Sequence, residues 1–394
     1  MVEIQGTVAP GFEPVREAFS ANFSDRNEIG GAFTAYHRGH KVVDIWGGES
    51  GPGRPWQEDT TTLVWSATKG MSALVAQLLV DHGALDLNRA VADYWPEFAS
   101  GGKGEITVLD ILTHGARLPW PPGYPAFVTA DDITGWDDPS PLVGLLEQAE
   151  PVLEAGHHGY HALTFGLLLG EVVERATGRT LGTVFRDEIA EPLGLTTRIG
   201  TPPTEQDSLA ELSLTIPPPP TDDPEILAMM AEALGPEGPT GRCLLVGQAG
   251  PTQFHRIGND TGFRAAEYPA ANGTTDARSL ARMYALLAMG GELDGLRLVS
   301  EESVERHRRE QWRGIDESLG AEKRYATGYM LAGTESETFG PNPDSFGHPG
   351  MGGSLGFADP ENGVGYGYVT NHMIFEVAVD PRALALAEAL YASI

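Results

Sequence analysis

The sequence predicts an α+β fold in which one antiparallel β-sheet, built from both ends of the chain, is flanked by helices and interrupted by a mainly helical insertion. Residues of alternating polarity, typical of strands, occur near the N-terminus and return after residue 328. Residues with helical periodicity fill the interval. Hydrophobic residues make up 41% of the 394 residues, which is enough for a large core. We expect a single domain over residues 1–394, with a helical or lid subdomain inserted over approximately residues 85–275.

The first predicted elements are a helix, a hairpin and a second helix. Apolar residues at helical spacing predict a helix over about 14–23, and these residues are Phe12, Val15, Phe19 and Phe23. Two alternating runs, 32–36 and 42–46, are separated by a short turn and predict a hairpin. A helix follows from about Ser66 to Gly83. Its buried stripe is expected to consist of Met71, Leu74, Val75, Leu78 and Leu79.

The rest of the chain supplies further helices and then strands. Helices are predicted over about 163–176, 181–189 and 278–289, strands over 328–331, 354–358 and 365–370, and a last helix opens at Pro381. Two stretches rich in proline and glycine, about 119–151 and 201–250, show no periodicity. Long segments of this kind are typical of functional lids or of disorder.

The charge balance excludes several classes of partner. The chain carries 55 acidic residues against 26 lysines and arginines, for a net charge of −29. Such a charge repels nucleic acids and anionic membrane surfaces. The acidic residues are spread along the chain, which favours a solubility surface over an acidic functional site. No run of about 18 apolar residues occurs, so the sequence predicts no membrane span.

Cysteine usage and the N-terminal residues bear on the compartment. Cys243 is the single cysteine, so no internal disulfide can form, as is usual for cytosolic proteins. Residues 1–6 lack the basic start and the apolar stretch of a secretory signal. We therefore expect a cytoplasmic protein, and we assign it no oligomeric state.

Residues 65–70 contain a serine and a lysine three positions apart at the start of a predicted helix. Positions i and i+3 lie on one helix face, so the side chains of Ser66 and Lys69 are neighbours. A serine hydroxyl is a poor nucleophile until a base removes its proton, and a desolvated lysine can be that base. Lysine is scarce here, with four copies in the chain, which gives this one more weight. The alternative interpretation is a serine that caps the helix beside a solvated lysine.

These residues resemble the Ser-x-x-Lys motif of serine β-lactamases, penicillin-binding proteins and family VIII carboxylesterases. Tyr160, in the stretch 159–166 before a predicted helix, resembles the tyrosine of the second motif of this superfamily. Residues 348–350 read His-Pro-Gly before a predicted strand, where the superfamily carries Lys-Thr-Gly or a variant that begins with His or Trp. Two further stretches resemble the esterase branch, 112–119 and 269–273. The resemblance covers nearly the whole chain and implies the β-lactamase and D,D-peptidase fold.

The resemblance also implies a role for each residue of the site. Ser66 would attack the acyl carbon, while Lys69 and Tyr160 would share the transfer of protons. The backbone N–H groups of Ser66 and Met351 would form the oxyanion hole. The residues implied to border the substrate pocket are His348 and Gly350. Which of the lysine and the tyrosine is the resting base stays open at this point.

Two positions depart from the superfamily pattern. Ala162 stands where β-lactamases carry the amide of Tyr-x-Asn, and His348 stands where a lysine pairs with the β-lactam carboxylate. An ester without a carboxylate needs neither group. The resemblance therefore implies a serine carboxylesterase that hydrolyses small or short-chain esters through an acyl-serine intermediate. The alternatives are an acyltransferase of the same fold and a weak β-lactamase or D,D-peptidase. A purely structural interpretation leaves Tyr160 as a packed tyrosine and His348 as a turn residue.

No cofactor and no metal are expected. His157, His158 and His161 lie close together in the sequence, but no acidic or cysteine ligand accompanies them at a recognised spacing. The expected partner is thus a small ester molecule.

One further motif points to a different serine. Residues 352–356 read Gly-Gly-Ser-Leu-Gly and match the Gly-x-Ser-x-Gly signature of α/β-hydrolases. That signature requires a helix directly after the serine, whereas the residues after Ser354 predict a strand end and a turn. We expect Ser354 to be structural.

Overall fold

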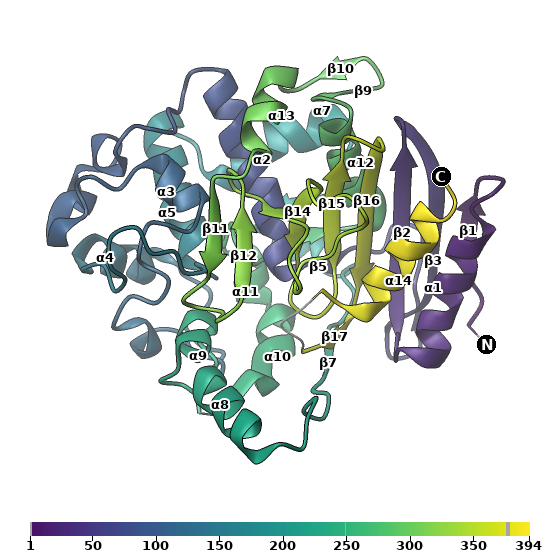
Figure 1. Ribbon diagram of the computed structural model, residues 1–394, viewed down its shortest axis with the longest axis horizontal. Coiled ribbons are helices and arrows are strands. Elements are labelled where there is room, and N and C mark those ends of the chain that lie inside the picture. Colours follow the sequence, from purple (N-terminus) through teal and green to yellow (C-terminus); the bar gives the residue numbers. More distant parts are fainter. Residues whose placement is uncertain (1, 249, 376–378) are drawn as a thin grey trace.

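The fold is centred on a ten-stranded antiparallel sheet to which both ends of the chain contribute strands, as predicted (Figure 1). A computed structural model describes residues 2–248, 250–375 and 379–394. The strand order is β1-β3-β2-β16-β15-β14-β13-β12-β11, with β4 paired to β3, and every pairing is antiparallel. The strands are β1 (Gln5–Val8), β2 (Gly30–His37), β3 (His40–Gly51), β4 (Arg54–Pro55), β11 (Trp312–Ile315), β12 (Glu322–Tyr325), β13 (Met330–Leu331), β14 (Phe346–Pro349), β15 (Leu355–Asp359) and β16 (Val364–Thr370).

The two chain ends meet where β2 pairs with β16 over seven residues, with Phe33 opposite Tyr368. Successive residues of β16 point to opposite faces of the sheet. Tyr366 donates a hydrogen bond to the Ala383 carbonyl of α14 (Pro381–Tyr391), which packs beside α1 (Glu13–Asp25). On the other face, Gly367 lies against α12 (Ala277–Ala288), where a Cβ atom would approach the Ala281 nitrogen to 2.5 Å. Glycine is needed there because the helix backbone sits directly on the strand.

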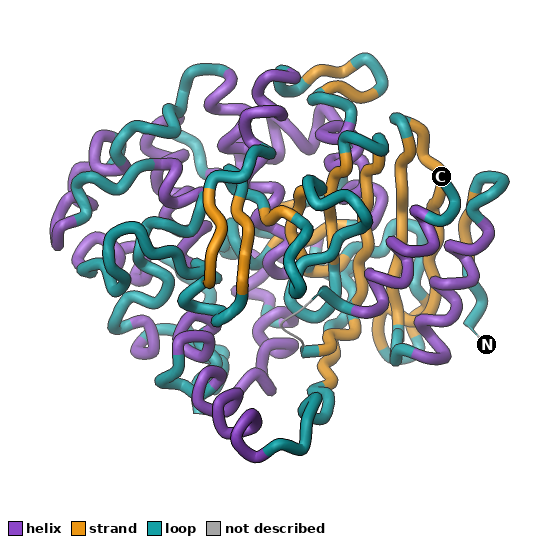
Figure 2. The backbone as a smooth tube through the Cα atoms, in the orientation of Figure 1, coloured by secondary structure: helices purple, strands orange, loops and turns teal. Residues whose placement is uncertain are grey.

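Helices and loops gather on the side of the molecule opposite the termini (Figure 2). The helices of the intervening part are α2 (Thr68–Asp81), α3 (Val108–Leu112), α4 (Ser140–Gln148), α5 (Thr164–Thr177), α6 (Leu181–Phe185), α7 (Glu191–Leu193), α8 (Pro224–Leu234), α9 (Pro239–Leu244), α10 (Phe254–Asn259), α11 (Thr261–Ala265) and α13 (Glu301–His307). Short strands accompany them as β5 (Thr62–Leu63), β6 (Arg198–Ile199), β7 (Ser213–Thr215), β8 (Gly273–Thr275), β9 (Glu292–Leu293), β10 (Leu296–Arg297) and β17 (His372–Ile374). The limits of the inserted subdomain, 85–275, stay a prediction.

The two stretches predicted without periodicity contain helices. The stretch 119–151 holds α4, and the stretch 201–250 holds α8 and α9. Flanking prolines and glycines hid them, because Asp223 caps α8 directly after a proline-rich run. The strand predicted over 328–331 is limited to Met330–Leu331. In the described part of the chain, no helix has both the length and the apolar character needed to cross a membrane.

Candidate active site

Ser66 lies in a 3-10 turn, Trp65–Ala67, that leads directly into α2. Trp65 has a φ of 46°, a left-handed conformation that is costly for a tryptophan and is held by its surroundings. The ring of Trp65 packs against Phe254 and Phe263. Strained backbone of this kind is typical of functional sites, and here it presents the half-buried Ser66 at the start of the helix.

Lys69 is fully buried in the first turn of α2 and its partners are uncharged. Its Nζ lies 3.4 Å from the Ser66 Oγ, 2.8 Å from the Ala162 carbonyl and 3.0 Å from the Ala270 carbonyl. Burial lowers the pKa of Lys69 to about 7, so the neutral amine is well populated at neutral pH. A neutral amine has two N–H donors and one lone pair. With both donors given to the carbonyls, the lone pair is left for the Ser66 hydroxyl.

Tyr160 completes a group of three side chains. It is buried, and its ring centre lies 4.7 Å from the Lys69 Nζ. Burial raises the pKa of the Tyr160 phenol well above its ordinary value, while its hydrogen bond with Ser66 acts in the opposite direction. The phenol therefore keeps its proton at neutral pH, whereas the amine beside it can accept one.

The backbone of Tyr160 is held from both sides. The Cys243 thiol of α9 donates to the Tyr160 carbonyl at 2.8 Å, and the Tyr160 N–H donates to the Asp316 carboxylate. Burial raises the pKa of Cys243 to about 12, so the thiol remains a donor. Neither Cys243 nor Asp316 was identified from the sequence as a support of this site, because they lie far along the chain and belong to no motif.

Two histidines fix the loops around Tyr160. The Nδ1 of His114 accepts a hydrogen bond from the His161 N–H at 3.0 Å, and the Nε2 of His161 accepts one from the Leu118 N–H at 3.0 Å. Burial lowers the pKa of His161 to about 3 and that of His114 well below its ordinary range. Both rings are thus neutral. They tie the stretch that resembled an esterase motif to the loop that carries Tyr160.

The three neighbouring histidines diverge in space. His157 pairs with Glu317, His158 stacks on the ring of Trp312 at 4.5 Å, and His161 is buried beside the ring of His114. Among residues 2–248, 250–375 and 379–394, no group of histidine, cysteine and acidic side chains is arranged to hold a metal ion.

The loop after β14 lies against the Ser66 turn. A Cβ atom on Gly350 would lie 2.1 Å from the Val64 carbonyl oxygen, so only glycine allows this approach. The Gly350 N–H donates to the Ser354 carbonyl at 2.7 Å. Within the described residues, the N–H of the next residue, Met351, has no hydrogen-bond partner. An unpaired amide beside a serine turn is the arrangement that a two-amide oxyanion hole requires.

His348 precedes this loop and is uncharged. Its Nδ1 contacts the Pro349 carbonyl oxygen at 2.7 Å, and its ring centre lies 6.0 Å from that of Tyr160. Burial, with a smaller effect from Lys69, holds the pKa of His348 well below its ordinary range. Its Nε2 is buried without a partner in the described part of the chain. A neutral ring here offers no positive charge to a carboxylate.

Ser354 is buried and followed directly by the strand β15. The strand-to-helix turn of the Gly-x-Ser-x-Gly signature is therefore not formed around this serine. Its carbonyl instead anchors Gly350, so this residue shapes the loop beside the site.

Comparisons with known proteins give one family and several close relatives. The family model described as Beta-lactamase matches residues 15–390. The chain is 34% identical over 385 residues to "Esterase/beta-lactamase LipL" of Mycobacterium tuberculosis (strain ATCC 25618 / H37Rv). The aligned region covers 96% of this chain and 85% of LipL.

Two solved structures match over the whole of both chains. A structure described as that of a family VIII carboxylesterase is 39% identical, with a TM-score of 0.85 and 100% of each chain covered. A penicillin-binding protein homologue from Caulobacter crescentus is 36% identical, also with a TM-score of 0.85 and 100% of each chain covered.

Proposed function

The chain belongs to the beta-lactamase family, and we propose that it acts within that family as a serine carboxylesterase on small or short-chain esters. The observation that carries the proposal is the pairing of a buried, proton-accepting Lys69 with a proton-keeping Tyr160, both against Ser66. The full-length likeness to proteins described as esterases supports the same reaction.

In the acylation step, the Ser66 Oγ attacks the ester carbonyl carbon while Lys69 takes the hydroxyl proton. The negative charge that develops on the carbonyl oxygen is stabilised by the N–H groups of Ser66 and Met351. When the C–O bond breaks, Tyr160 gives its proton to the departing alkoxide and receives the proton held by Lys69. The products of this half-reaction are the free alcohol and an acyl-serine.

In the deacylation step, water attacks the acyl-serine and the same pair takes its proton. The bond to the Ser66 Oγ breaks, the proton passes to this oxygen, and the carboxylic acid leaves. The resting assignment follows from the two pKa directions. Lys69 is the base in the free enzyme because its pKa lies near 7, and Tyr160 is the acid because burial raises its pKa.

The site favours an ester over a β-lactam. Ala162 contributes its carbonyl to Lys69 and has no side-chain amide to offer a substrate. His348 is neutral, so no cation at this position pairs with the carboxylate of a β-lactam. An ester that carries no carboxylate loses nothing from either substitution. We also propose a cytoplasmic location, which the single, buried Cys243 supports.

The proposal is tested with Ser66→Ala and a panel of nitrophenyl esters beside a chromogenic cephalosporin. We expect ester hydrolysis in the wild type, slow or no cephalosporin turnover, and loss of activity by several orders of magnitude in Ser66→Ala. A fluorophosphonate should label Ser66 in the wild type alone. Added alcohols measure how far the acyl-serine is passed to an alcohol instead of water. Full ester activity in Ser66→Ala would end the proposal.

A further inference from the structure

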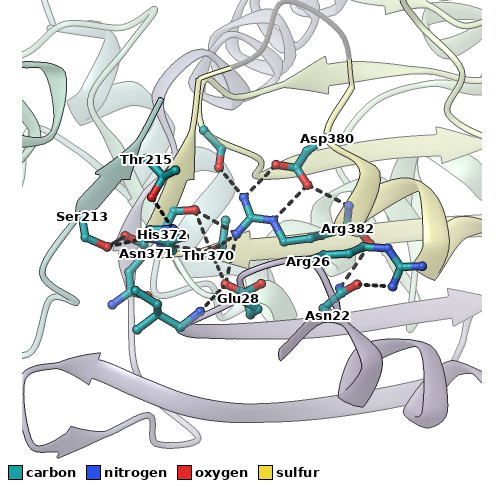
Figure 3. A network of polar contacts seen from close by, with 12 residues as sticks. Asn22, Arg26, Glu28, Ser213, Thr215, Thr370, Asn371, His372, Asp380 and Arg382 are labelled. Carbon is teal, nitrogen blue, oxygen red and sulfur yellow. Dashed lines mark hydrogen bonds and ion pairs between the residues drawn. The ribbon is translucent and has the colours of Figure 1, made fainter. Parts of the chain in front are cut away.

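A fully buried arginine lies beneath the loop that carries Met351. Arg382 stands in the first turn of α14, between Glu28 and Asp380 (Figure 3). Its side chain is 0% exposed. Its guanidinium lies 2.7 Å from Asp380 and 3.2 Å from Glu28. Glu28 comes from the segment before β2, so the ion pair joins the two ends of the chain. Burying three charged groups is costly unless every one of them is paired.

The same guanidinium donates to two backbone carbonyls. Its Nη2 donates to the Gly352 carbonyl at 2.8 Å, and its Nη1 donates to the His372 carbonyl at 2.9 Å. Gly352 directly follows Met351. A planar group with five N–H donors can serve carboxylates and carbonyls together, which a lysine ammonium cannot do in the same geometry.

Backbone hydrogen bonds also hold the loop of residues 350–353, and one of them lies within the loop, from the Gly353 N–H to the Gly350 carbonyl at 3.1 Å. Gly352 and Gly353 have φ values of 90° and 125°, in the region that favours glycine, and neither has a side chain to pack. On one side of Met351, the Gly350 N–H is anchored to the Ser354 carbonyl at 2.7 Å. On the other side, the Gly352 carbonyl accepts from Arg382 at 2.8 Å and from the Ile374 N–H at 3.4 Å. Met351 therefore lies between the hydrogen bond at Gly350 and the two hydrogen bonds at Gly352. Of the two at Gly352, the bond from the Arg382 guanidinium is the shorter.

We propose that Arg382 is a positioning residue of the oxyanion hole: it fixes the loop of residues 350–353 so that the Met351 N–H faces the oxygen on which charge develops. This inference rests on the proposed function. Donors aimed in advance stabilise the transition state more than the bound substrate, and small displacements of such groups cost rate. Loss of the bond to Gly352 should therefore lower kcat and leave KM nearly unchanged.

The first test is Arg382→Lys, which keeps one positive charge between Glu28 and Asp380 but cannot also reach the Gly352 carbonyl. The matched control is Arg324→Lys. Arg324 likewise pairs with two carboxylates, those of Glu310 and Asp344, and it donates to two carbonyls outside the loop of residues 350–353, those of Ala332 and Pro343.

We expect the kcat of Arg382→Lys on a nitrophenyl ester to fall about 10- to 100-fold, with KM within about threefold. Arg324→Lys should stay within about threefold of the wild type. A second readout is the affinity for a trifluoromethyl ketone, whose carbonyl carbon is attacked by the Ser66 Oγ to give a hemiketal with the negative charge on the former ketone oxygen. This affinity should fall in proportion to kcat. A kcat for Arg382→Lys less than fivefold below that of the control would overturn the inference.

A second pair of variants serves if Arg382→Lys does not fold. Glu28→Gln/Arg382→Met removes one charge of each sign, and Glu28→Gln alone is its reference. The double variant should show at least a fivefold lower kcat than the single one at equal KM, and a smaller difference rejects the inference. Both arms use the full chain. The Ser66→Ala variant distinguishes failure of the proposed function from failure of this inference. If Ser66 is not the nucleophile, Ser66→Ala remains active, and the Arg382 variants then report only on folding.

Discussion

Two buried basic side chains of this protein, Lys69 and Arg382, differ in the charge of their partners and in their roles. Lys69 is surrounded by two carbonyls and a hydroxyl, and no carboxylate shifts its pKa. Arg382, by contrast, lies between the carboxylates of Glu28 and Asp380. Burial lowers the pKa of Lys69 to about 7. At Arg382, burial again opposes the charge, but Tyr368 and the two carboxylates outweigh it and raise the pKa further. Burial without a carboxylate thus turns the Lys69 amine into a base, whereas burial between two carboxylates keeps the Arg382 guanidinium charged and joined to them.

The largest effect is expected when Lys69 is replaced by a residue that keeps its charge, as Arg382 does. In Lys69→Arg the guanidinium keeps its proton near neutral pH and cannot accept one from Ser66. We expect kcat/KM for a nitrophenyl ester to fall at least about 1,000-fold. Lys103→Arg is the control, because Lys103 is also a buried lysine whose Nζ donates to backbone carbonyls, three in its case, and it lies outside the site. Activity of Lys69→Arg within tenfold of that control would contradict the assigned role.

The second contrast is in stability. Arg382→Met leaves Glu28 and Asp380 buried without a cation, which should lower the free energy of unfolding by about 3–5 kcal/mol. Lys69→Met removes a buried amine that no carboxylate compensates, so it should raise the free energy of unfolding. Urea titrations of both variants measure the two values. Equal losses in the two variants would show that the partners do not distinguish the cations.

The stability of Lys69→Met relative to the wild type should also depend on pH. The pKa of Lys69 is lowered in the folded state from 10.5 to about 7, so the unfolded chain binds more protons between these values. The free energy of unfolding of the wild type therefore rises with pH in this window. The advantage of Lys69→Met should be about 2–3 kcal/mol larger at pH 6 than at pH 9. A difference independent of pH would mean that Lys69 titrates normally.

The same pKa governs the rate. The wild-type kcat/KM should fall about tenfold per pH unit on the acid side of a limb near pH 7, as Lys69 becomes protonated. Placing a carboxylate nearby, in Cys243→Asp, should shift this limb upward by about one unit, because an opposite charge favours the ammonium. Cys243→Ser, which keeps a donor for the Tyr160 carbonyl, should leave the limb in place. An unshifted limb in Cys243→Asp would remove Lys69 as the titrating base.

The smallest effect is expected at Ser354, which belongs to neither cation. Ser354→Ala keeps the backbone carbonyl that anchors Gly350. It should therefore retain at least about a tenth of the wild-type kcat/KM, as a structural residue of the loop. If Ser354→Ala were inactive while Ser66→Ala stayed active, the nucleophile would be Ser354 and the assignment to Ser66 would be wrong.

Local patterns were enough to predict the elements that border the Ser66 region. Apolar periodicity predicted α2, α5 and α12, and the motif spacing predicted that Ser66 neighbours Lys69, although Ser66 lies in the 3-10 turn before α2 and not in the helix itself. The contacts that tie distant segments together have no such signature. Glu28 and Arg382 are separated by 354 positions, and β11, β12 and β14 are four-residue strands too short for a clear alternation. The support of Tyr160 by Cys243 and Asp316 was invisible for the same reason.

The seam between β2 and β16 has a consequence for how the protein is made. During synthesis, β2 emerges from the ribosome more than 300 residues before the strand that completes it. Until residue 370 has been translated, one edge of the N-terminal hairpin exposes unpaired backbone groups, which are a template for aggregation. Contacts this distant along the chain are also slow to form, because a long loop must close first. A chain that ended after α12 would contain Ser66 and Lys69 but would lack β11 to β16, so its sheet would stay open.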